Sequence, residues 1–191
     1  MGHDDLNLLA GRSQGRQEFA HLTGGVGVAL TRFPSREPKR VATVGLGTGT
    51  IAAYAQEGDY FCFYEINPNV RLLATTEFTY LSDAQQRGAT VHIELGDARI
   101  SFERQEPQHY DIIALDAFSG DSIPAHLLTQ EAFAAYRRHL QPDGVIAVHI
   151  SNRHLQLEPV VLSQAENLQP GVEFPLWTDR YNNLFQLLNV F

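Results

Sequence analysis

The stretch RVATVGLGTGT, residues 40–50, decides the fold of this chain. Its first half, residues 40–44, is a short run rich in β-branched side chains, which predicts a buried strand. Its second half places glycines at alternate positions, Gly45, Gly47 and Gly49, and glycine permits the tight turn by which a strand passes into a helix. The stretch therefore indicates the first strand and turn of a βαβ unit.

Four more short apolar runs follow along the chain, and helical stretches separate most of them. Strands that alternate with helices form parallel sheets with right-handed crossovers, and the helices cover both faces. We therefore predict an α/β protein with a doubly wound, mostly parallel sheet. The further strands are expected at residues 60–64, 90–95, 110–115 and 145–150, and the helical stretches at 23–32, 50–56, 68–82 and 129–140.

The length of 191 residues suits one domain with terminal extensions. We expect an N-terminal extension with a helix at residues 1–39 and a nucleoside-binding Rossmann-like domain at residues 40–165. The remaining residues, 166–191, are expected to be a C-terminal tail.

The composition excludes several classes of protein. With 14 Lys+Arg against 22 Asp+Glu the formal net charge is -8, which argues against a nucleic-acid partner and suits a cationic or neutral small ligand. The single cysteine, Cys62, excludes an internal disulfide, and the histidines lack metal-ligand spacing, so we expect no metal. No apolar run approaches the length of a membrane span, so we expect no membrane segment. Asp4 and Asp5 stand where a signal peptide would have positive charge, so we expect a cytoplasmic protein.

Carboxylates follow the predicted strands at the edge of the sheet where doubly wound folds bind ligands. Glu65 ends the second strand, 20 positions after Gly45 (65 − 45 = 20). A carboxylate at that distance from a glycine turn accepts the hydroxyl protons of a ribose in nucleoside-binding folds. Asp97, after the third strand, could accept a hydrogen bond from an adenine amino group, or it could cap the following turn. The glycine turn, Glu65 and Asp97 together fit an adenosine group without a pyrophosphate.

Two further acids, Asp116 and Asp121, follow the fourth strand and flank a short loop. Paired acids at this edge could hold an ammonium group and remove its proton, which makes the amine a nucleophile. The alternative is that Asp121 caps the turn that follows. His149, inside the fifth predicted strand, is expected to be a hydrogen-bonded core residue rather than a ligand.

Six motifs follow one another along the chain, namely VGLGTGT at 44–50, YEINP at 64–68, GDAR at 96–99, LDAFSGD at 115–121, HISNR at 149–153 and WTD at 177–179. In this order they resemble the spermidine synthase family, in particular the spermidine-synthase-like domains of bacteria. The similarity extends over about residues 25–154 and continues near the C-terminus. Each motif alone also occurs in class I methyltransferases, which have the same fold, so the ordered set is the specific signal.

The resemblance implies a Rossmann-like S-adenosylmethionine-dependent methyltransferase fold. It also implies decarboxylated S-adenosylmethionine as the donor and a diamine such as putrescine as the acceptor. The implied donor contacts are the glycine turn of Gly45, Gly47 and Gly49, the ribose-binding Glu65, and Asp97 with Ala98 at the adenine. The implied acceptor residues are Asp116, which deprotonates the amine, and Asp121 and Gln17, which bind the diamine.

The chain departs from the family's pattern at three places. Its glycine turn is Gly-Leu-Gly-Thr-Gly-Thr rather than Gly-Gly-Gly-Asp-Gly-Gly, and is closer to that of a methyltransferase. Asp116 and Asp121 are five positions apart (121 − 116 = 5), whereas the family's loop places its two acids three apart. Too few residues follow the fifth predicted strand for the two extra strands of the family.

Three functions stay open on this sequence. The leading hypothesis is an aminopropyltransferase like spermidine synthase, since acids near the acceptor favour a cationic substrate. The second is an S-adenosylmethionine-dependent methyltransferase, which the glycine turn favours. The third is a nucleoside-binding module without catalysis. The oligomeric state is open as well, with a homodimer among the candidates.

Overall fold

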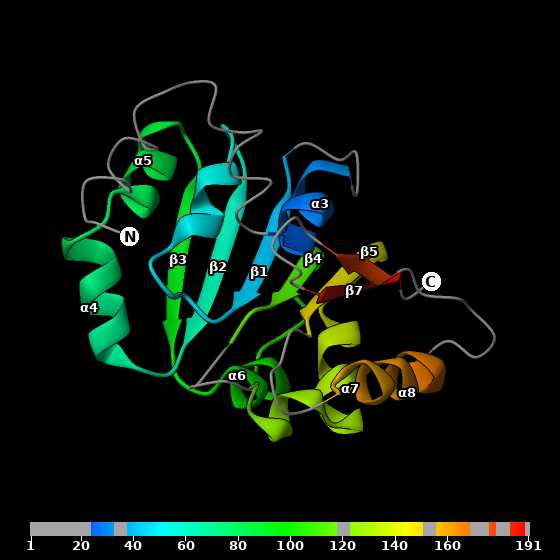
Figure 1. Ribbon diagram of the computed structural model, residues 1–191. Coiled ribbons are helices and arrows are strands. Elements are labelled where there is room, and N and C mark those ends of the chain that lie inside the picture. Colours follow the sequence, from blue (N-terminus) through cyan, green and yellow to red (C-terminus); the bar gives the residue numbers. More distant parts are fainter. Residues whose placement is uncertain are drawn as a thin grey trace.

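A single sheet organises the part of the chain that the computed structural model describes, namely residues 24–32, 38–117, 123–150, 156–168, 176–178 and 184–189. The sheet has seven strands in the order β3-β2-β1-β4-β5-β7-β6 (Figure 1). The strands are β1 (Arg40–Val44), β2 (Tyr60–Glu65), β3 (Thr90–Leu95), β4 (Tyr110–Leu115), β5 (Leu140–His149), β6 (Leu176–Thr178) and β7 (Leu184–Asn189).

The five strands β1 to β5 run parallel, and β7 is antiparallel to β5 and to β6. The order of the parallel strands, 3-2-1-4-5, reverses direction between β1 and β4, which is the point where open α/β sheets bind ligands. This arrangement confirms the predicted doubly wound, mostly parallel α/β fold.

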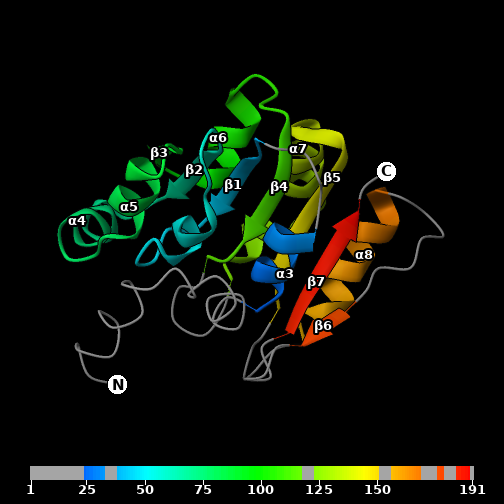
Figure 2. The same ribbon diagram turned by 90° about the horizontal axis from the view of Figure 1, so that it is seen from above.

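Helices cover both faces of the sheet, as doubly wound topology requires. Figure 2 shows α3 and α8 on opposite sides of β7. Helices α3 and α5 and the 3-10 helix η1 lie on one face, with α4 beside α5, and α6, η2, α7 and α8 lie on the other. Their bounds are α3 (Gly24–Arg32), η1 (Thr50–Tyr54), α4 (Pro68–Thr76), α5 (Tyr80–Gln86), α6 (Ala98–Arg104), η2 (Ala125–Leu128), α7 (Gln130–Arg138) and α8 (Glu158–Leu168).

One apolar core lies on each face because side chains of a strand alternate between the two sides. In β1, Val41 packs on the α3 side, whereas Ala42 and Val44 pack on the α6 and α7 side. In β4 the same alternation places Ile112 on the first side and Ile113 on the second. Buried on both faces, the two central strands hold the sheet's carboxyl edge in a fixed position.

The helix predicted at residues 68–82 is two helices, α4 and α5. Helix α4 ends at Thr76, where Thr75 and Thr76 turn their hydroxyls back onto main-chain carbonyls one turn earlier. Such bonds compete with the helical pattern and favour its termination. The prediction was wrong because it followed the apolar spacing and not the two threonines.

The prediction that too few residues remain for two strands beyond β5 is also wrong. Strand β6 is only three residues long, and β7 pairs with β5 from Val145↔Asn189 to His149↔Phe185, so the two strands need little chain. Strand β5 itself starts at Leu140, five residues before the predicted start at residue 145, and so includes residues 142–144. The register of β4 and β5 shifts there, between Tyr110 and Ile112, which accommodates the extra residues.

Two helices, α6 and α8, were not predicted, whereas the helix expected at residues 23–32 is observed as α3. Helix α6 is only seven residues long and starts directly after a strand, so its apolar spacing is too short to stand out. Among the helices described, none has the length and apolar character that crossing a membrane requires.

Candidate active site

A cavity of about 420 Å³ opens at the carboxyl ends of the parallel strands. Its volume lies in the range of small-molecule sites, roughly 300–1,000 Å³. It brings together three of the predicted carboxylates, Glu65, Asp97 and Asp116, which come from the ends of three different strands. The glycine turn, Ala98 and the segment around η2 complete the described part of the wall, with lining residues that include Gly45, Gly47, Pro124, His126 and Leu127.

The glycine turn after β1 lies against the residue that follows β4, and it also lines the cavity. Gly45 has a φ of +98°, and a Cβ added there would lie 2.6 Å from the main-chain oxygen of Asp116. Gly47 has a φ of +54° and lines the cavity, and a Cβ there would meet nothing within 4 Å. Gly49 is the N-cap of η1 and is not among the described lining residues, and a Cβ added there would lie 3.1 Å from the side chain of Leu81. The structure therefore brings Gly45 and Gly47 to the cavity and uses Gly49 in the turn.

Glu65 is 8% exposed and is held by two main-chain groups. The N–H of Leu46 donates to Oε2 at 3.1 Å, and the N–H of Asn67 donates to Oε1 at 2.8 Å. These bonds fix the carboxylate between the glycine turn and the start of α4. Because a carboxylate oxygen can accept two hydrogen bonds, each oxygen retains capacity for a ligand hydroxyl.

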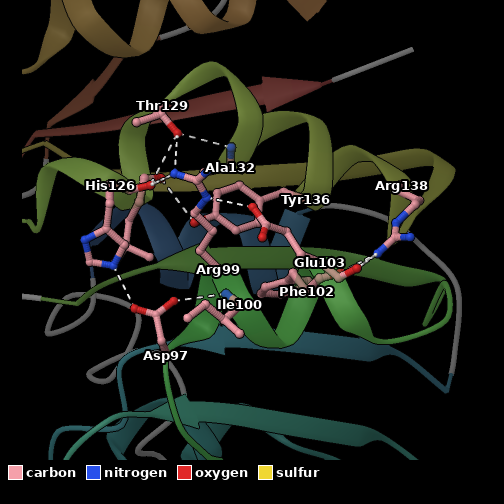
Figure 3. A network of polar contacts seen from close by, with 11 residues as sticks. Asp97, Arg99, Ile100, Phe102, Glu103, His126, Thr129, Ala132, Tyr136 and Arg138 are labelled. Carbon is pink, nitrogen blue, oxygen red and sulfur yellow. Dashed lines mark hydrogen bonds and ion pairs between the residues drawn. The ribbon is translucent and has the colours of Figure 1, made fainter.

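Asp97 is the N-cap of α6 and contacts η2. Its Oδ1 accepts from the N–H of Ile100 at 3.0 Å, and its Oδ2 lies 2.9 Å from Nε2 of His126 (Figure 3). The capping alternative raised by the sequence is thus observed, and Asp97 also faces the cavity. His126 was not singled out in the sequence, because nothing local marks it and its partner lies 29 positions earlier.

A network of polar contacts holds η2 against α6 (Figure 3). Arg99 donates to the hydroxyl of Thr129 at 3.2 Å and to Glu103 at 2.8 Å. Thr129 in turn caps α7 by accepting from the N–H of Ala132, and the hydroxyl of Tyr136 donates to the carbonyl of Leu127. The wall of the cavity at His126 is therefore braced from α6 and from α7.

Asp116 directly follows β4, and its Oδ1 lies 2.7 Å from Nδ1 of His149 at the end of β5. The side chains are 37% and 18% exposed, respectively. The expectation that His149 is hydrogen-bonded is confirmed, and its partner is the very carboxylate predicted to act on the acceptor. The other two predicted acceptor residues, Gln17 and Asp121, lie outside the described residues.

No family model matches this chain, but its sequence is similar to those of known proteins. It is 31% identical, over 59% of its length, to a polyamine aminopropyltransferase of Vibrio vulnificus, of which the match covers 38%. It is 32% identical, over 56% of its length, to an N-terminal histidine N-methyltransferase of Emericella nidulans, of which the match covers 19%. The matches thus span well under half of these curated relatives.

Solved structures share the fold at low sequence identity. Human methyltransferase-like protein 13 in complex with SAH superposes with a TM-score of 0.65 at 21% identity, covering 90% of this chain and 82% of that one. Spermidine synthase from Thermotoga maritima superposes with a TM-score of 0.63 at 16% identity, covering 91% and 60%. These superpositions show that the chain has the Rossmann-like fold of the S-adenosylmethionine-dependent methyltransferases. Within that fold, the sequence of the chain is similar to that of a polyamine aminopropyltransferase over 59% of its length.

Proposed function

We propose that this protein transfers an aminopropyl group from decarboxylated S-adenosylmethionine to a diamine such as putrescine. The observation that carries the proposal is the charge of the cavity. Its described lining includes three carboxylates, Glu65, Asp97 and Asp116, and no lysine or arginine. The decarboxylated donor and the acceptor are both cationic, so an acidic wall attracts them. Ordinary S-adenosylmethionine carries a carboxylate, which that wall repels.

The donor half of the site is assigned by chemistry and by the resemblance. Glu65 accepts the ribose hydroxyls with the lone pairs that Leu46 and Asn67 leave available. Asp97 and Ala98 face the adenine, and Gly45 and Gly47 let the main chain approach the nucleoside closely. Gly49 supports the site through the geometry of the turn.

The acceptor half centres on Asp116. The amine loses a proton to the Asp116 carboxylate, and its lone pair attacks the methylene carbon bound to the donor's sulfonium. The new C–N bond forms as the C–S bond breaks. The electron pair of the broken C–S bond stays on sulfur, and methylthioadenosine leaves as a neutral thioether. Orientation and proton removal supply the acceleration. Asp121 and Gln17 are proposed to hold the distal part of the diamine.

A second function, methyl transfer from S-adenosylmethionine, is favoured by two observations. One is the 32% identity to an N-methyltransferase over 56% of the chain. The other is the glycine turn Gly-Leu-Gly-Thr-Gly-Thr at residues 45–50. The same cavity would then hold a methyl donor, and the acceptor amine would meet the same Asp116.

Product analysis separates the two. The protein is incubated with putrescine and either decarboxylated S-adenosylmethionine or S-adenosylmethionine, and the nucleoside products are separated by chromatography. Methylthioadenosine from the first donor, with no S-adenosylhomocysteine from the second, supports aminopropyl transfer. The reverse result supports methyl transfer. Tight binding of methylthioadenosine with neither product would leave only a binding module.

A further inference from the structure

His149 does not line the cavity in its described part, yet it contacts the carboxylate that reaches the acceptor end. Its Nδ1 lies 2.7 Å from Oδ1 of Asp116, a length typical of a charge-assisted hydrogen bond. Asp116 itself lines the cavity, and no hydrogen bond to its Oδ2 is found among the described residues. The two oxygens of this carboxylate thus have different surroundings.

The pairing of these side chains follows from the register of two parallel strands. Leu115 in β4 lies opposite Val148 in β5, and both side chains belong to the core on the α6 and α7 side. The next residue of each strand, Asp116 and His149, therefore turns the same way. His149 also pairs through its main chain with Phe185 of β7, so its position is fixed from both neighbouring strands.

We infer that His149 is a positioning residue for Asp116, an inference that rests on the proposed aminopropyl transfer. Its Nδ1–H donates to Oδ1 and so holds the carboxylate in one rotamer, with Oδ2 toward the acceptor amine. During the reaction the amine proton passes to Oδ2, while the proton of His149 stays on Nδ1. His149 touches neither substrate, and its role is to set the direction of the accepting oxygen.

Two substitutions at His149 test this role. His149→Phe keeps a ring of similar volume and removes the donor. His149→Asn keeps a nitrogen donor at the δ position. We expect His149→Phe to lower kcat for putrescine about 10- to 100-fold, because orientation of the base contributes to the rate. We expect His149→Asn to recover most of that loss. The KM for putrescine and the Kd for methylthioadenosine should change less than about threefold in both variants.

A matched control is available at His92. This histidine also contacts a carboxylate, Glu94, but on the exposed edge strand β3 and outside the cavity lining. His92→Phe should leave kcat at the wild-type value. Thermal unfolding of every variant shows whether the fold is retained.

A readout that needs no turnover separates this inference from the proposed function. In ¹⁵N NMR spectra of the wild-type protein, His149 should show a protonated Nδ1, and Asp116→Asn should shift both of its ring-nitrogen signals. If the wild type makes no product, aminopropyl transfer is wrong, and the role of His149 is decided by these signals alone. Three results would each overturn the inference. They are a wild-type kcat in folded His149→Phe, equal losses of kcat in His149→Phe and His149→Asn, and His149 ring-nitrogen signals that Asp116→Asn does not shift.

Discussion

His126 Nε2 lies 2.9 Å from Oδ2 of Asp97, so the carboxylate that follows β3 is engaged on both oxygens before any ligand arrives. One oxygen caps α6 and the other anchors η2. The remaining lone pairs of the same two oxygens are what an adenine amino group can use. In the proposed function, this residue therefore links the stability of two helices to the binding of the nucleoside.

Substitutions at Asp97 should separate these roles. Asp97→Ala removes the cap and should cost about 0.5–2 kcal/mol of unfolding free energy, whereas Asp97→Asn keeps an acceptor for Ile100 and should cost much less. Both should weaken methylthioadenosine binding about tenfold, equivalent to about 1.4 kcal/mol. Urea unfolding and calorimetric titration measure the two effects. Equal stability of the two variants would contradict the capping role.

Glu65 should tolerate no replacement, even by its amide. It accepts one main-chain N–H on each oxygen, from Leu46 and Asn67. Glu65→Gln presents an NH₂ group to one of those N–H donors and leaves it unsatisfied, which should cost about 1–3 kcal/mol of unfolding free energy. Methylthioadenosine binding should be lost as well.

The matched control for Glu65 is Glu94→Gln, on the edge strand β3, where the carboxylate contacts an exposed histidine. That variant should unfold at the wild-type urea concentration and bind methylthioadenosine normally. If Glu65→Gln behaves like Glu94→Gln, the two main-chain bonds do not hold the carboxylate as described.

The two cavity glycines should respond differently to a methyl group. Gly45→Ala would bring Cβ against the main-chain oxygen of Asp116, and we expect a loss of stability of about 1–3 kcal/mol beyond the backbone strain. Gly47→Ala has open space around it, so only the strain of its positive φ remains, about 1–2 kcal/mol. Chemical unfolding of the two variants, compared with wild type, measures the difference. A Gly45→Ala protein as stable as Gly47→Ala would contradict the close approach of β1 and β4.

Acid should destabilise the protein through His139, which is completely buried. Its Nδ1 accepts from the N–H of Gln108 and its Nε2 donates to the carbonyl of Phe102, so the ring is neutral and cannot take a second proton without losing a bond. Burial lowers the pKa of His139 below its usual value of 6.5. The unfolded chain then binds more protons than the folded one, and stability is full above about pH 6.5 and falls as the pH drops below it.

The measurement is urea unfolding of wild type and His139→Gln between about pH 5 and 8. The substitution should lower stability at high pH, since the acceptor for Gln108 is lost. It should also reduce the fall in stability toward low pH. Parallel curves for the two proteins would contradict the neutral state of His139 in the fold.

Much of the fold could be predicted from sequence because four of the parallel strands contain apolar runs and β3 alternates apolar with polar residues. Strands β1, β3 and β4 have the predicted bounds, and β2 extends one residue further. The carboxylates Glu65, Asp97 and Asp116 were found because each lies at the end of such a strand or within two residues of it, and parallel topology brings strand ends to one edge. The order of the strands along the chain was therefore enough to predict that these three carboxylates lie at the same cavity.

The partners of those carboxylates could not be found in the same way. His126 and His149 meet Asp97 and Asp116 across 29 and 33 positions, and the contacts depend on where η2 packs and on the register of β4 and β5. Strand β6 was missed because a three-residue strand has no periodicity to detect, and β7 because its residues were assigned to a C-terminal tail. Such features follow from tertiary packing, which local patterns do not record.

A short series of contacts, most of them through the main chain, connects the proposed nucleoside half of the cavity to its proposed amine half. The Glu65 carboxylate accepts from the N–H of Leu46, and the N–H of Asp116 donates to the carbonyl of Val44. The neighbouring Gly45 is so near that a Cβ added there would lie 2.6 Å from the carbonyl oxygen of Asp116. Substitutions in the surrounding helices can thus change which amines enter the proposed acceptor site. The distance between Glu65, the proposed ribose ligand, and Asp116, the proposed general base, stays constant. A designer seeking a longer or bulkier nucleophile would do best to leave this backbone junction alone and to vary the helical walls.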